Sequence, residues 1–530
     1  MSISVEVRLL SGKTATLKTG WDEGVETLNR RAQTALGVGR GRLVDSSGSV
    51  LDACASVKKA MLQNGDSLTL HISRVQVQGS REAFAAIRGD GSVVTWGDAG
   101  AGGDSSALQD QLKNVQQVQS SDMAFAAIRG DGSVVTWGDA DRGGDSTAVQ
   151  GQLTNVLQIQ ATVGAFAAIL GNGSAVTWGH KLFGGDSSAV QDRLKNVQQI
   201  QACEAAFAAI LGDGSVVTWG FALYGGDSSC VQDQLKNVQQ IQASGCAFAA
   251  ILGDGSVVTW GDEDLGGDSS SAQGQLTNVR QIQATDASFA AILGDGSVMT
   301  WGEADRGGDS TAVKDQLTNV LQIQATRFAF AAILGDGSVV TWGDASFGGD
   351  SSAVQDQLKN VQQIQACQNA FAAILGNGSV VTWDVGAAAG DSRAVQHKLK
   401  DVQQIQGCQG AFAAVLGDGS VVTWGRAGAP LNLSGMQDPL KHAQQIQASS
   451  AAFAAVLGDG CIVTWGAGGY GGDSSSVQVL LKLKLSDKVR KNLKLYPAMS
   501  IKGRAAFNFG PRSYKIAVMV GPERSSYERL

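Results

Sequence analysis

Ten tryptophans recur at a spacing of 41 residues, and this period constrains the fold more than any other feature of the chain. Each closes a phrase of the form Phe-Ala-Ala-Ile-Leu-Gly-Asp-Gly-Ser-Val-Val-Thr-Trp. A period of about 40 residues marks one supersecondary unit, copied many times and stacked on its own copies. The ten are Trp96, Trp137, Trp178, Trp219, Trp260, Trp301, Trp342, Trp383, Trp424 and Trp465.

The repeated unit is predicted to be a small antiparallel sheet. In the copy that contains Trp137, residues 115–119, 124–128 and 134–137 are three runs rich in β-forming residues. Asp-Gly or Asn-Gly joins the last two runs in all ten copies and favours a tight hairpin turn. The middle run is apolar on both faces, so it is predicted to be buried between neighbouring sheets. A fourth short element is expected in the Ser-Ser-Ala-Val-Gln-Asp-Gln-Leu segment.

The repeated tryptophans are predicted to fill the space between adjacent sheets. Ten equivalent aromatic residues in one structural phrase indicate core positions rather than ligand contacts. The fold class is therefore mainly β, with ten copies of a blade-like sheet. Truncating one tryptophan is expected to cost about 3–5 kcal/mol of stability.

Residues 1–72 show a different pattern, typical of a β-grasp domain. A hairpin is predicted over residues 5–18, a helix over 25–36, and short strands at 42–44 and 50–51. A helical turn at 57–61 and a last strand at 67–72 follow.

This first segment resembles ubiquitin-like domains. The matching stretches are Val-Arg-Leu-Leu-Ser-Gly-Lys-Thr-Ala-Thr-Leu, in the first hairpin, and Asn-Gly-Asp-Ser-Leu, before the last strand. Members that become conjugated end in Gly-Gly, whereas Ile72 here runs into Ser73-Arg74, so conjugation is not expected. The resemblance implies a docking domain. A β-grasp domain without a role in ubiquitin pathways is the alternative.

The repeats, over residues 73–485, resemble those of the regulator-of-chromosome-condensation family. The matching words are Asp-Gly-Ser-Val-Val-Thr-Trp-Gly, Gly-Gly-Asp-Ser and Asn-Val-Gln-Gln-Ile-Gln-Ala. The family forms β-propellers, and it includes a nucleotide exchanger for a nuclear GTPase, the propellers of large ubiquitin ligases and a plant ultraviolet-B receptor. The copies here are shorter than is usual in the family. Propellers commonly have about four to eight blades, so ten copies leave both a closed ring and an open superhelix possible.

Charge is unevenly spread along the chain. The net charge is −7, but residues 480–530 hold twelve Lys/Arg against three Asp/Glu, so this end carries +9 and the remainder −16. The acidic body is not expected to bind nucleic acid. Residues 486–530 are predicted to be a basic, partly disordered tail. No membrane span or signal peptide is evident, which favours the cytoplasm or the nucleus.

Catalytic, metal and cofactor sites are not indicated. The seven cysteines include no Cys-x-x-Cys, which argues against a zinc site or a disulfide framework. The four histidines do not recur with a nearby nucleophile, and no phosphate-binding loop occurs. The repeated Asp of Gly-Gly-Asp-Ser is predicted to cap a turn rather than bind calcium, which needs about six to eight converging oxygens. The chain is therefore predicted not to be an enzyme.

The near-identical copies differ mainly in two segments, one between the first and second runs and one after Trp-Gly. In an up-and-down sheet these two connections lie at the same end. Loops on a rigid framework carry binding residues, and aromatic and arginine side chains suit protein contacts. The predicted partner-binding residues are Arg142, His180, Lys181, Phe183, Phe221, Tyr224, Arg306, Phe328 and Phe347. Neutral variation of tolerant loops is the alternative.

The sequence thus favours a non-enzymatic protein-interaction scaffold, with a link to ubiquitin signalling implied by both resemblances. Its partners would be proteins, from the ubiquitin machinery or a small GTPase. Guanine-nucleotide exchange on a small GTPase is one alternative function, and tryptophan-based ultraviolet-B sensing is another. A recently duplicated array without a selected partner is a third.

Overall fold

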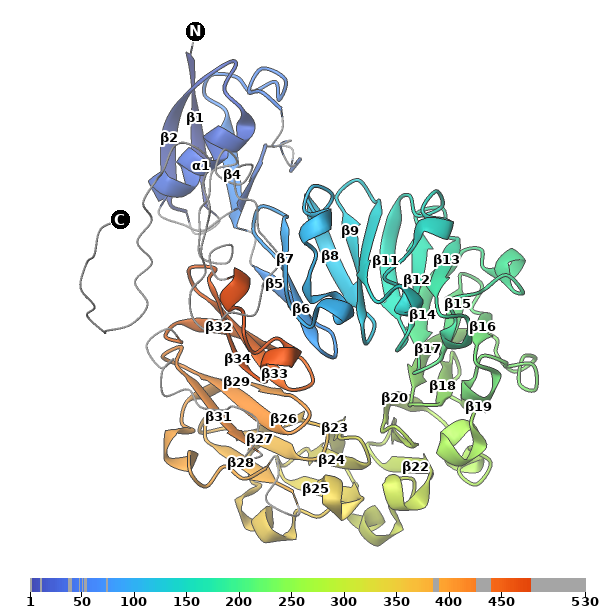
Figure 1. The fold of residues 1–530 in the computed structure, drawn as a ribbon. Helices are drawn as coiled ribbons and strands as arrows, with labels where there is room; N and C mark the ends of the chain where they lie inside the picture. The colour runs from blue at the N-terminus through green and yellow to red at the C-terminus, as the bar shows by residue number, and fades with distance from the viewer. Residues whose placement is uncertain are drawn as a thin grey trace, which may run out of the picture. The chain divides into compact units, whose positions relative to one another are not determined.

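The computed structural model describes residues 2–9, 12–36, 41–46, 48–49, 51, 55–72, 75–384, 390–425 and 440–477. The chain divides into two compact units, residues 1–481 and 482–530, and all described residues belong to the first. Among them the structure is mainly β, as predicted. Figure 1 shows a small mixed sheet followed by a succession of three-stranded sheets.

The N-terminal domain is a β-grasp. Its sheet has the order β2-β1-β4-β3, in which β1 (Ser2–Arg8) pairs antiparallel with β2 (Thr14–Gly20) and parallel with β4 (Ser67–Ile72). The helix α1 (Val25–Leu36) has the predicted bounds, and β3 (Gly41–Val44) pairs with β4. The prediction of a strand at residues 50–51 is wrong at Leu51, which lies in a loop. The Leu51 N–H nevertheless donates to the Leu43 carbonyl. Val50 lies outside the described residues.

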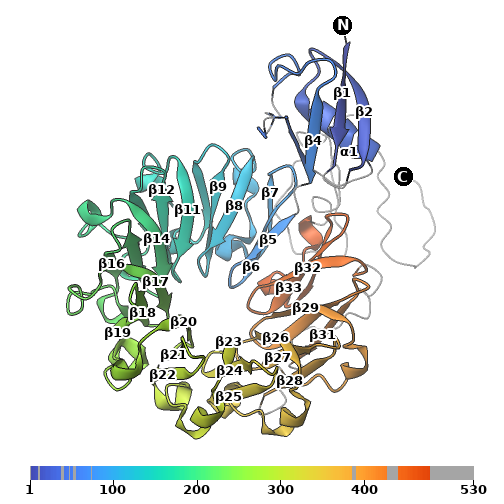
Figure 2. The same cartoon turned by 180° about the vertical axis from the view of Figure 1, so that it is seen from behind.

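Ten antiparallel sheets of three strands follow, numbered here repeats 1 to 10 (Figure 1, Figure 2). The first strands are β5 (Gln76–Gly79), β8 (Val115–Ser120), β11 (Val156–Ala161), β14 (Val197–Ala202), β17 (Val238–Ala243), β20 (Val279–Ala284), β23 (Val320–Ala325), β26 (Val361–Ala366), β29 (Val402–Gly407) and β32 (Ala443–Ala448). The second strands are β6 (Ala83–Ile87), β9 (Ala124–Arg129), β12 (Ala165–Leu170), β15 (Ala206–Leu211), β18 (Ala247–Leu252), β21 (Ser288–Leu293), β24 (Ala329–Leu334), β27 (Phe371–Leu375), β30 (Ala411–Leu416) and β33 (Ala452–Leu457). The third strands are β7 (Val93–Gly97), β10 (Val134–Gly138), β13 (Ala175–Gly179), β16 (Val216–Gly220), β19 (Val257–Gly261), β22 (Val298–Gly302), β25 (Val339–Gly343), β28 (Val380–Trp383), β31 (Val421–Gly425) and β34 (Ile462–Gly466).

The expected fourth element is a 3₁₀ turn and not a strand. In repeat 7, for example, the segment before β26 forms a 3₁₀ helix over Ser352–Gln357. Gln355 Nε2 then donates to the Val339 carbonyl at the start of β25, at 2.8 Å. The segment is thus held against the third strand by a side-chain hydrogen bond, and its backbone does not pair with that strand.

The hydrophobic core lies between neighbouring sheets. Second-strand residues of repeat 2, such as Ala126 and Ile128, pack against Ile159, Phe166 and Trp178 of repeat 3. All ten repeated tryptophans are only 2–4% exposed, and each stacks on the phenylalanine paired with it across the sheet, with ring centroids 5.2–5.5 Å apart. The alanines of the second strand let the sheets approach closely enough for this packing.

The indole N–H groups of the repeated tryptophans also join neighbouring repeats. Trp137 Nε1 donates to the Gly102 carbonyl at 3.0 Å, and eight of the ten tryptophans show the equivalent bond. For Trp424 and Trp465, the equivalent positions 389 and 430 lie outside the described residues. Gly102 has φ +89°, and a Cβ there would lie 2.7 Å from the Phe125 ring. The first glycine of Gly-Gly-Asp-Ser is therefore required by the aromatic pair of the next repeat.

Repeats 1 and 10 contact each other in the same way as successive repeats, so the array closes into a ring. Phe84 and Trp96 of repeat 1 share a buried cluster with Ala454 and Ile462 of repeat 10. Trp96 Nε1 donates to the Gly471 carbonyl at 3.0 Å. Of the two arrangements that the sequence leaves open, the closed ring is the one found.

Candidate functional site: the loop face of the repeats

The two variable connections of each repeat meet at one end of the sheet, as the strand order predicts. We call the segment between the first and second strands the inner connection, the segment after Trp-Gly the rim loop, and the surface they share the loop face. In repeat 3, Thr162 Oγ1 of the inner connection donates to the Phe183 carbonyl of the rim loop at 2.8 Å. Equivalent bonds join Ser121 to Arg142, Cys203 to Tyr224, Ser244 to Leu265, Thr326 to Phe347 and Ser449 to Tyr470.

The rim loops are single helical turns with different first residues. In η3 (Ala140–Arg142), the side chain of Asp139 accepts a bond from the Arg142 N–H, and Asp344 caps η12 (Ala345–Phe347) similarly. In repeats 3 and 4 the capping position holds His180 and Phe221, ahead of η5 (Lys181–Phe183) and η7 (Ala222–Tyr224). An aromatic residue at this position replaces an aspartate. The turns of repeats 3 and 4 therefore contain no carboxylate, whereas those of repeats 2 and 5 on either side do.

Arg142, His180 and Phe183 form one contact group across repeats 2 and 3. The Arg142 guanidinium carbon lies 5.1 Å from the centre of the Phe183 ring, and the rings of His180 and Phe183 lie 5.0 Å apart. Lys181 points elsewhere, because its Nζ lies 3.6 Å from an Asp186 carboxylate oxygen and its side chain is exposed. Three of the predicted partner-binding residues, Arg142, His180 and Phe183, are therefore in contact with one another. Lys181, the fourth in this region, pairs with Asp186 instead.

Repeat 4 carries a second aromatic pair, Phe221 and Tyr224, with ring centroids 5.1 Å apart in an edge-to-face arrangement. Next to these pairs, Leu182 and Leu223 are 61% and 67% exposed. Both leucines occupy the middle of a rim turn, where the backbone places the side chain away from the sheet. Neither leucine is among the predicted partner-binding residues, although each lies between two of them in the chain.

Arg306, Phe328 and Phe347 form a third group, across repeats 6 and 7. The Arg306 guanidinium carbon is 4.3 Å from the centre of the Phe328 ring, and that ring meets Phe347 edge to face at 4.7 Å. Arg327 approaches the same ring at 5.0 Å. Stacking of an arginine on an aromatic face holds the guanidinium in place while its N–H groups stay available.

The inner connections meet around a central pocket of about 1030 Å³, lined by all ten repeats. First strands of neighbouring repeats contact one another, which places them nearest the axis. The middle residue of each inner connection is called here a central residue. The central residues are Arg81, Asp122, Val163, Glu204, Gly245, Asp286, Arg327, Gln368, Gln409 and Ser450.

A ladder of backbone hydrogen bonds joins the central residues around the ring. The Arg81 N–H donates to the Asp122 carbonyl at 3.1 Å, and the equivalent bond joins every other pair of neighbouring central residues except Gln368 and Gln409. The Ser450 N–H donates to the Arg81 carbonyl at 3.1 Å, so the ladder also joins repeat 10 to repeat 1. The backbone is thus fixed at these positions, and only the side chain differs between repeats. The central residues were not predicted as a set from the sequence. They could have been recognised there as one position that recurs every 41 residues and varies among otherwise near-identical copies.

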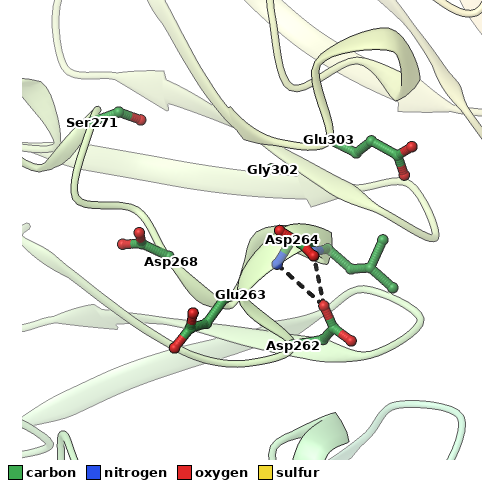
Figure 3. Close-up of a pocket in the computed structure, with 8 residues that line it drawn as sticks. Asp262, Glu263, Asp264, Asp268, Ser271, Gly302 and Glu303 are labelled. Atoms are coloured by element: carbon green, nitrogen blue, oxygen red, sulfur yellow. Dashed lines mark hydrogen bonds between the residues drawn. The ribbon is translucent and has the colours of Figure 1, made fainter.

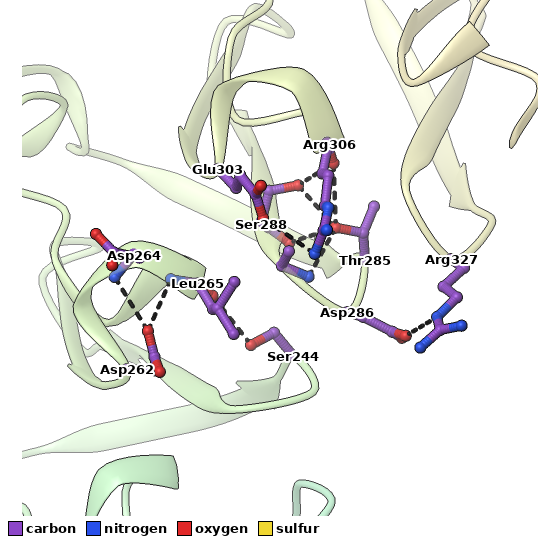
Figure 4. A network of polar contacts seen from close by, with 11 residues as sticks. Ser244, Asp262, Asp264, Leu265, Thr285, Asp286, Ser288, Glu303, Arg306 and Arg327 are labelled. Atoms are coloured by element: carbon purple, nitrogen blue, oxygen red, sulfur yellow. Dashed lines mark hydrogen bonds and ion pairs between the residues drawn. The ribbon is translucent and has the colours of Figure 1, made fainter. Parts of the chain in front are cut away.

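Charges on the central residues are paired at two places. Arg327 Nε lies 2.7 Å from Asp286 Oδ2, a pair shown in Figure 4 together with Arg306 and Glu303. Arg81 Nη1 lies 3.8 Å from Asp122 Oδ2. Burial raises the pKa of the Asp122 carboxyl, although Arg81 and Arg142 act in the opposite direction.

A second, acidic pocket of about 640 Å³ lies between the rim loops of repeats 5 and 6. Asp262, Asp264 and Asp268 line it from one repeat and Glu303 from the next (Figure 3). Asp262 caps η8 (Glu263–Gly267), since it accepts bonds from the N–H groups of Asp264 and Leu265 at 3.2 Å. Among the described residues, no group of three His, Cys, Asp or Glu side chains is arranged to hold a metal ion.

The Asp of Gly-Gly-Asp-Ser caps a turn, as the sequence predicts. Asp186 Oδ1 accepts a bond from the Ser188 N–H at 3.0 Å, and this bond lowers the pKa of the Asp186 carboxyl. The pKa of Asp391 falls to about 2, chiefly because the Arg393 side chain donates to it. The same bond to the N–H two residues on is made by Asp104, Asp145, Asp227, Asp268, Asp309, Asp350, Asp391 and Asp473.

The buried cysteines of the inner connections are poor nucleophiles. Burial raises the pKa of the Cys203 thiol to about 12, and that of Cys367 to about 12. Cys203 Sγ instead donates to the Tyr224 carbonyl at 3.2 Å, where other repeats use Ser or Thr. The thiol thus replaces a hydroxyl in a structural bond.

The β-grasp domain shows a polar outer face on its described strands. Glu6 and Arg8 of β1 and Thr16 and Lys18 of β2 are exposed, while the residues that alternate with them are buried. Any docking through this face would therefore depend on polar and charged contacts. No helix in the part of the chain that the structure describes has the length and apolar character needed to cross a bilayer.

No protein-family model matches the chain. A search of curated proteins also finds no match. Among solved structures, the repeats are similar to yeast RCC1 (Prp20), whose structure was solved bound to Kap60. The match has 16% identity, covers 44% of this chain and 70% of that chain, and has a TM-score of 0.30. Human WBSCR16 is similar at 16% identity over 44% of this chain and 79% of its own, with a TM-score of 0.28. A de novo designed protein based on ubiquitin matches 13% of this chain at 22% identity, over 85% of its own length, with a TM-score of 0.12. The chain thus has structural similarity to RCC1-like propellers and, in a short segment, to a ubiquitin-based design.

Proposed function

We propose that this protein is a non-enzymatic interaction scaffold whose loop face binds a partner protein. One observation carries the proposal. Ten near-identical repeats differ mainly in two connections, and the fold brings both connections to one end of every sheet. Variation limited to one surface of a rigid framework is typical of a binding surface.

The side chains on that surface support a protein partner. Aromatic and arginine residues dominate the energetics of protein interfaces, and three arginine–aromatic or aromatic–aromatic groups lie on the loop face. The exposed Leu182 and Leu223 add apolar area beside two of them. Arg142 and Arg306 are held over rings, so less side-chain entropy would be lost when a partner binds.

The N-terminal domain is the basis for a proposed link to ubiquitin signalling. Its β-grasp topology is that of a ubiquitin-like domain, and its outer face offers charged contacts. In this proposal residues 1–72 dock on a component of the ubiquitin machinery while the repeats hold a second protein, in the cytoplasm or the nucleus. Nucleotide exchange on a small GTPase stays an alternative, to be tested by the same experiment.

The test compares proteins captured from lysate by three versions of the full chain, quantified by mass spectrometry. The rim variant carries Leu182→Ser and Leu223→Ser. The control carries Leu157→Ser and Leu321→Ser, which remove leucines of matched exposure, 61% and 63%, from first strands. We expect one or more proteins to be lost by the rim variant and retained by the control.

Equal capture by the rim variant, the control and the unmodified chain would contradict the proposal. A captured GTPase whose bound nucleotide is released by the purified chain would favour the exchange alternative. Ubiquitin-machinery proteins that disappear when residues 1–72 are removed would support the docking role of the first domain.

A further inference from the structure

The central pocket is a site separate from the rim loops. It is open, it has a volume of about 1030 Å³, and each repeat contributes to its wall. Pockets for single small molecules typically have volumes of about 300–1,000 Å³, so this pocket has room for several residues of a peptide. The backbone ladder fixes its wall, and the identity of each central side chain is what gives the pocket its character.

The central residues break the symmetry of the ring into two unlike halves. From repeat 2 to repeat 6 they are three carboxylates separated by Val163 and Gly245. From repeat 7 through repeat 10 to repeat 1 they are arginine or neutral polar residues, namely Arg327, Gln368, Gln409, Ser450 and Arg81. Ten copies with the same central residue would give a uniform pocket, whereas these residues give it one acidic half and one half that is basic or neutral.

We infer that the central pocket binds an extended polypeptide segment of the partner protein, with an arginine or lysine side chain against Glu204. This inference rests on the proposed function, because the segment belongs to a protein bound at the loop face. It adds a second contact site and specifies the chemistry that the site recognises.

Glu204 is the carboxylate that the pocket leaves open for a cation. Asp122 and Asp286, on its two sides, are paired with Arg81 and Arg327 at 3.8 and 2.7 Å. No ion pair to Glu204 is found within the described ranges, which include all ten central residues. The neighbours Val163 and Gly245 bring no side-chain charge.

The electrostatic environment of Glu204 also favours an added cation. Desolvation raises the pKa of its carboxyl most, the negative charge of Asp286 raises it further, and Arg327 only partly opposes these effects. A partly desolvated carboxylate next to like charges is stabilised by an opposite charge within about 4–6 Å. A guanidinium or ammonium group on a bound segment would supply that charge.

The opposite half of the ring suits a peptide backbone. The side-chain amides of Gln368 and Gln409 each offer N–H donors and a carbonyl acceptor, and the Ser450 hydroxyl offers both. Peptide N–H and C=O groups that leave water need such partners. A free metal ion would not use this half of the pocket, whereas a peptide with one basic side chain would use both halves.

The test selects binders from a library of random twelve-residue peptides displayed on phage, using the full chain as the target. We expect the selected peptides to be enriched in arginine or lysine at one position. The affinity of the best peptide, measured by fluorescence anisotropy, should fall at least about fivefold in the Glu204→Gln variant. Glu204→Gln keeps the size of the side chain and alters an exposed position, and circular dichroism would verify that the variant is folded.

Asp192→Asn is the matched control, because it removes one negative charge from an exposed residue that does not line the pocket. It should leave peptide affinity unchanged. Failure to select any peptide, a pool without basic enrichment, or equal affinity for the Glu204→Gln variant would each overturn the inference. If the rim variant loses its partner while Glu204→Gln retains both partner and peptide, the inference fails and the proposed function stands.

Discussion

At the scale of single residues, the repeated tryptophans join neighbouring repeats by packing and by a hydrogen bond. Trp260 is 2% exposed, stacks on Phe248 with centroids 5.3 Å apart, and donates to the Gly225 carbonyl of the preceding repeat at 3.0 Å. The side chain therefore contributes apolar burial within one core cluster and satisfies a buried carbonyl in the rim loop of the preceding repeat. The phrase in which it lies is conserved among the copies for this structural reason.

We expect Trp260→Ala to lower the free energy of unfolding by about 3–5 kcal/mol, because it leaves a cavity and an unpaired carbonyl. Guanidinium denaturation followed by circular dichroism would measure the change. Leu157→Gln is the control, since it restores the glutamine found at the equivalent place in most repeats and alters an exposed side chain. That substitution should change stability by no more than about 0.5 kcal/mol. A Trp260→Ala protein as stable as the control would contradict the structural role of the repeated indoles.

At the scale of elements, the rim loop connects the predicted partner-binding residues to the core of the next repeat. Gly184 follows Phe183, has φ +90°, and lies against the Phe207 ring of repeat 4, where a Cβ would approach to 2.6 Å. Lys181, Leu182 and Phe183 are therefore held by a turn whose last residue touches the core. Side-chain variation is tolerated at the tip of the turn and excluded at its end.

Gly184→Ala should destabilise the protein by more than about 1 kcal/mol, because the left-handed backbone and the aromatic contact both oppose a Cβ. Gly274→Ala provides the comparison: it lies in an exposed turn with no heavy atom within 4 Å of the added carbon and no positive φ. That change should be neutral or stabilise by roughly 0.4–1 kcal/mol. Thermal unfolding of the two variants would compare them, and equal midpoints would show that the close approach to Phe207 is not a constraint.

At the scale of the whole ring, the closing contact protects the outermost sheets. Repeats 1 and 10 bury Phe84, Trp96 and Ile462 against each other and share the bonds Trp96–Gly471 and Ser450–Arg81. Without closure, both of these apolar faces would be exposed to water. Solenoids that do not close need special capping repeats with a polar outer face, whereas repeats 1 and 10 keep the apolar phrase of all the others.

A chain that ends at residue 440 lacks repeat 10 and should lose this protection. We expect it to unfold at a lower denaturant concentration and to bind a hydrophobic dye, because the apolar faces of repeats 1 and 9 become exposed. A chain that ends at residue 481 keeps every closing contact named above and serves as the control. Identical midpoints and dye binding for the two chains would show that closure adds no stability.

Much of the fold could be predicted from local patterns. The period of 41, the Asp-Gly turns and the apolar middle run predict three-stranded sheets, and helix α1 has its predicted bounds. The strand predicted at Leu51 was wrong, because a two-residue run contains too little pattern to separate a strand from an extended loop. The fourth element proved to be a 3₁₀ turn because the glutamine of that segment bonds to the third strand through its side chain.

The candidate site could be predicted only in part. Variable loops identify the loop face, and Arg142, Phe183, Arg306 and Phe328 do lie in contact groups there. The central pocket was not predicted, since its wall comes from residues 41 positions apart that meet only when the ring closes. The pairing of Asp286 with Arg327 likewise depends on the position of the neighbouring repeat.

The sequence by itself determined the repeated unit, because turn residues, alternation and the aromatic pair act over a few tens of residues along the chain. Only the tertiary structure decided that ten units close and which side chains then share a pocket. Closure depends on a small rotation between neighbouring sheets that adds up over ten interfaces, and no single residue specifies that sum. The same accumulation brings Arg81 and Ser450 together from opposite ends of the array, and it makes ten separate variable positions into one surface.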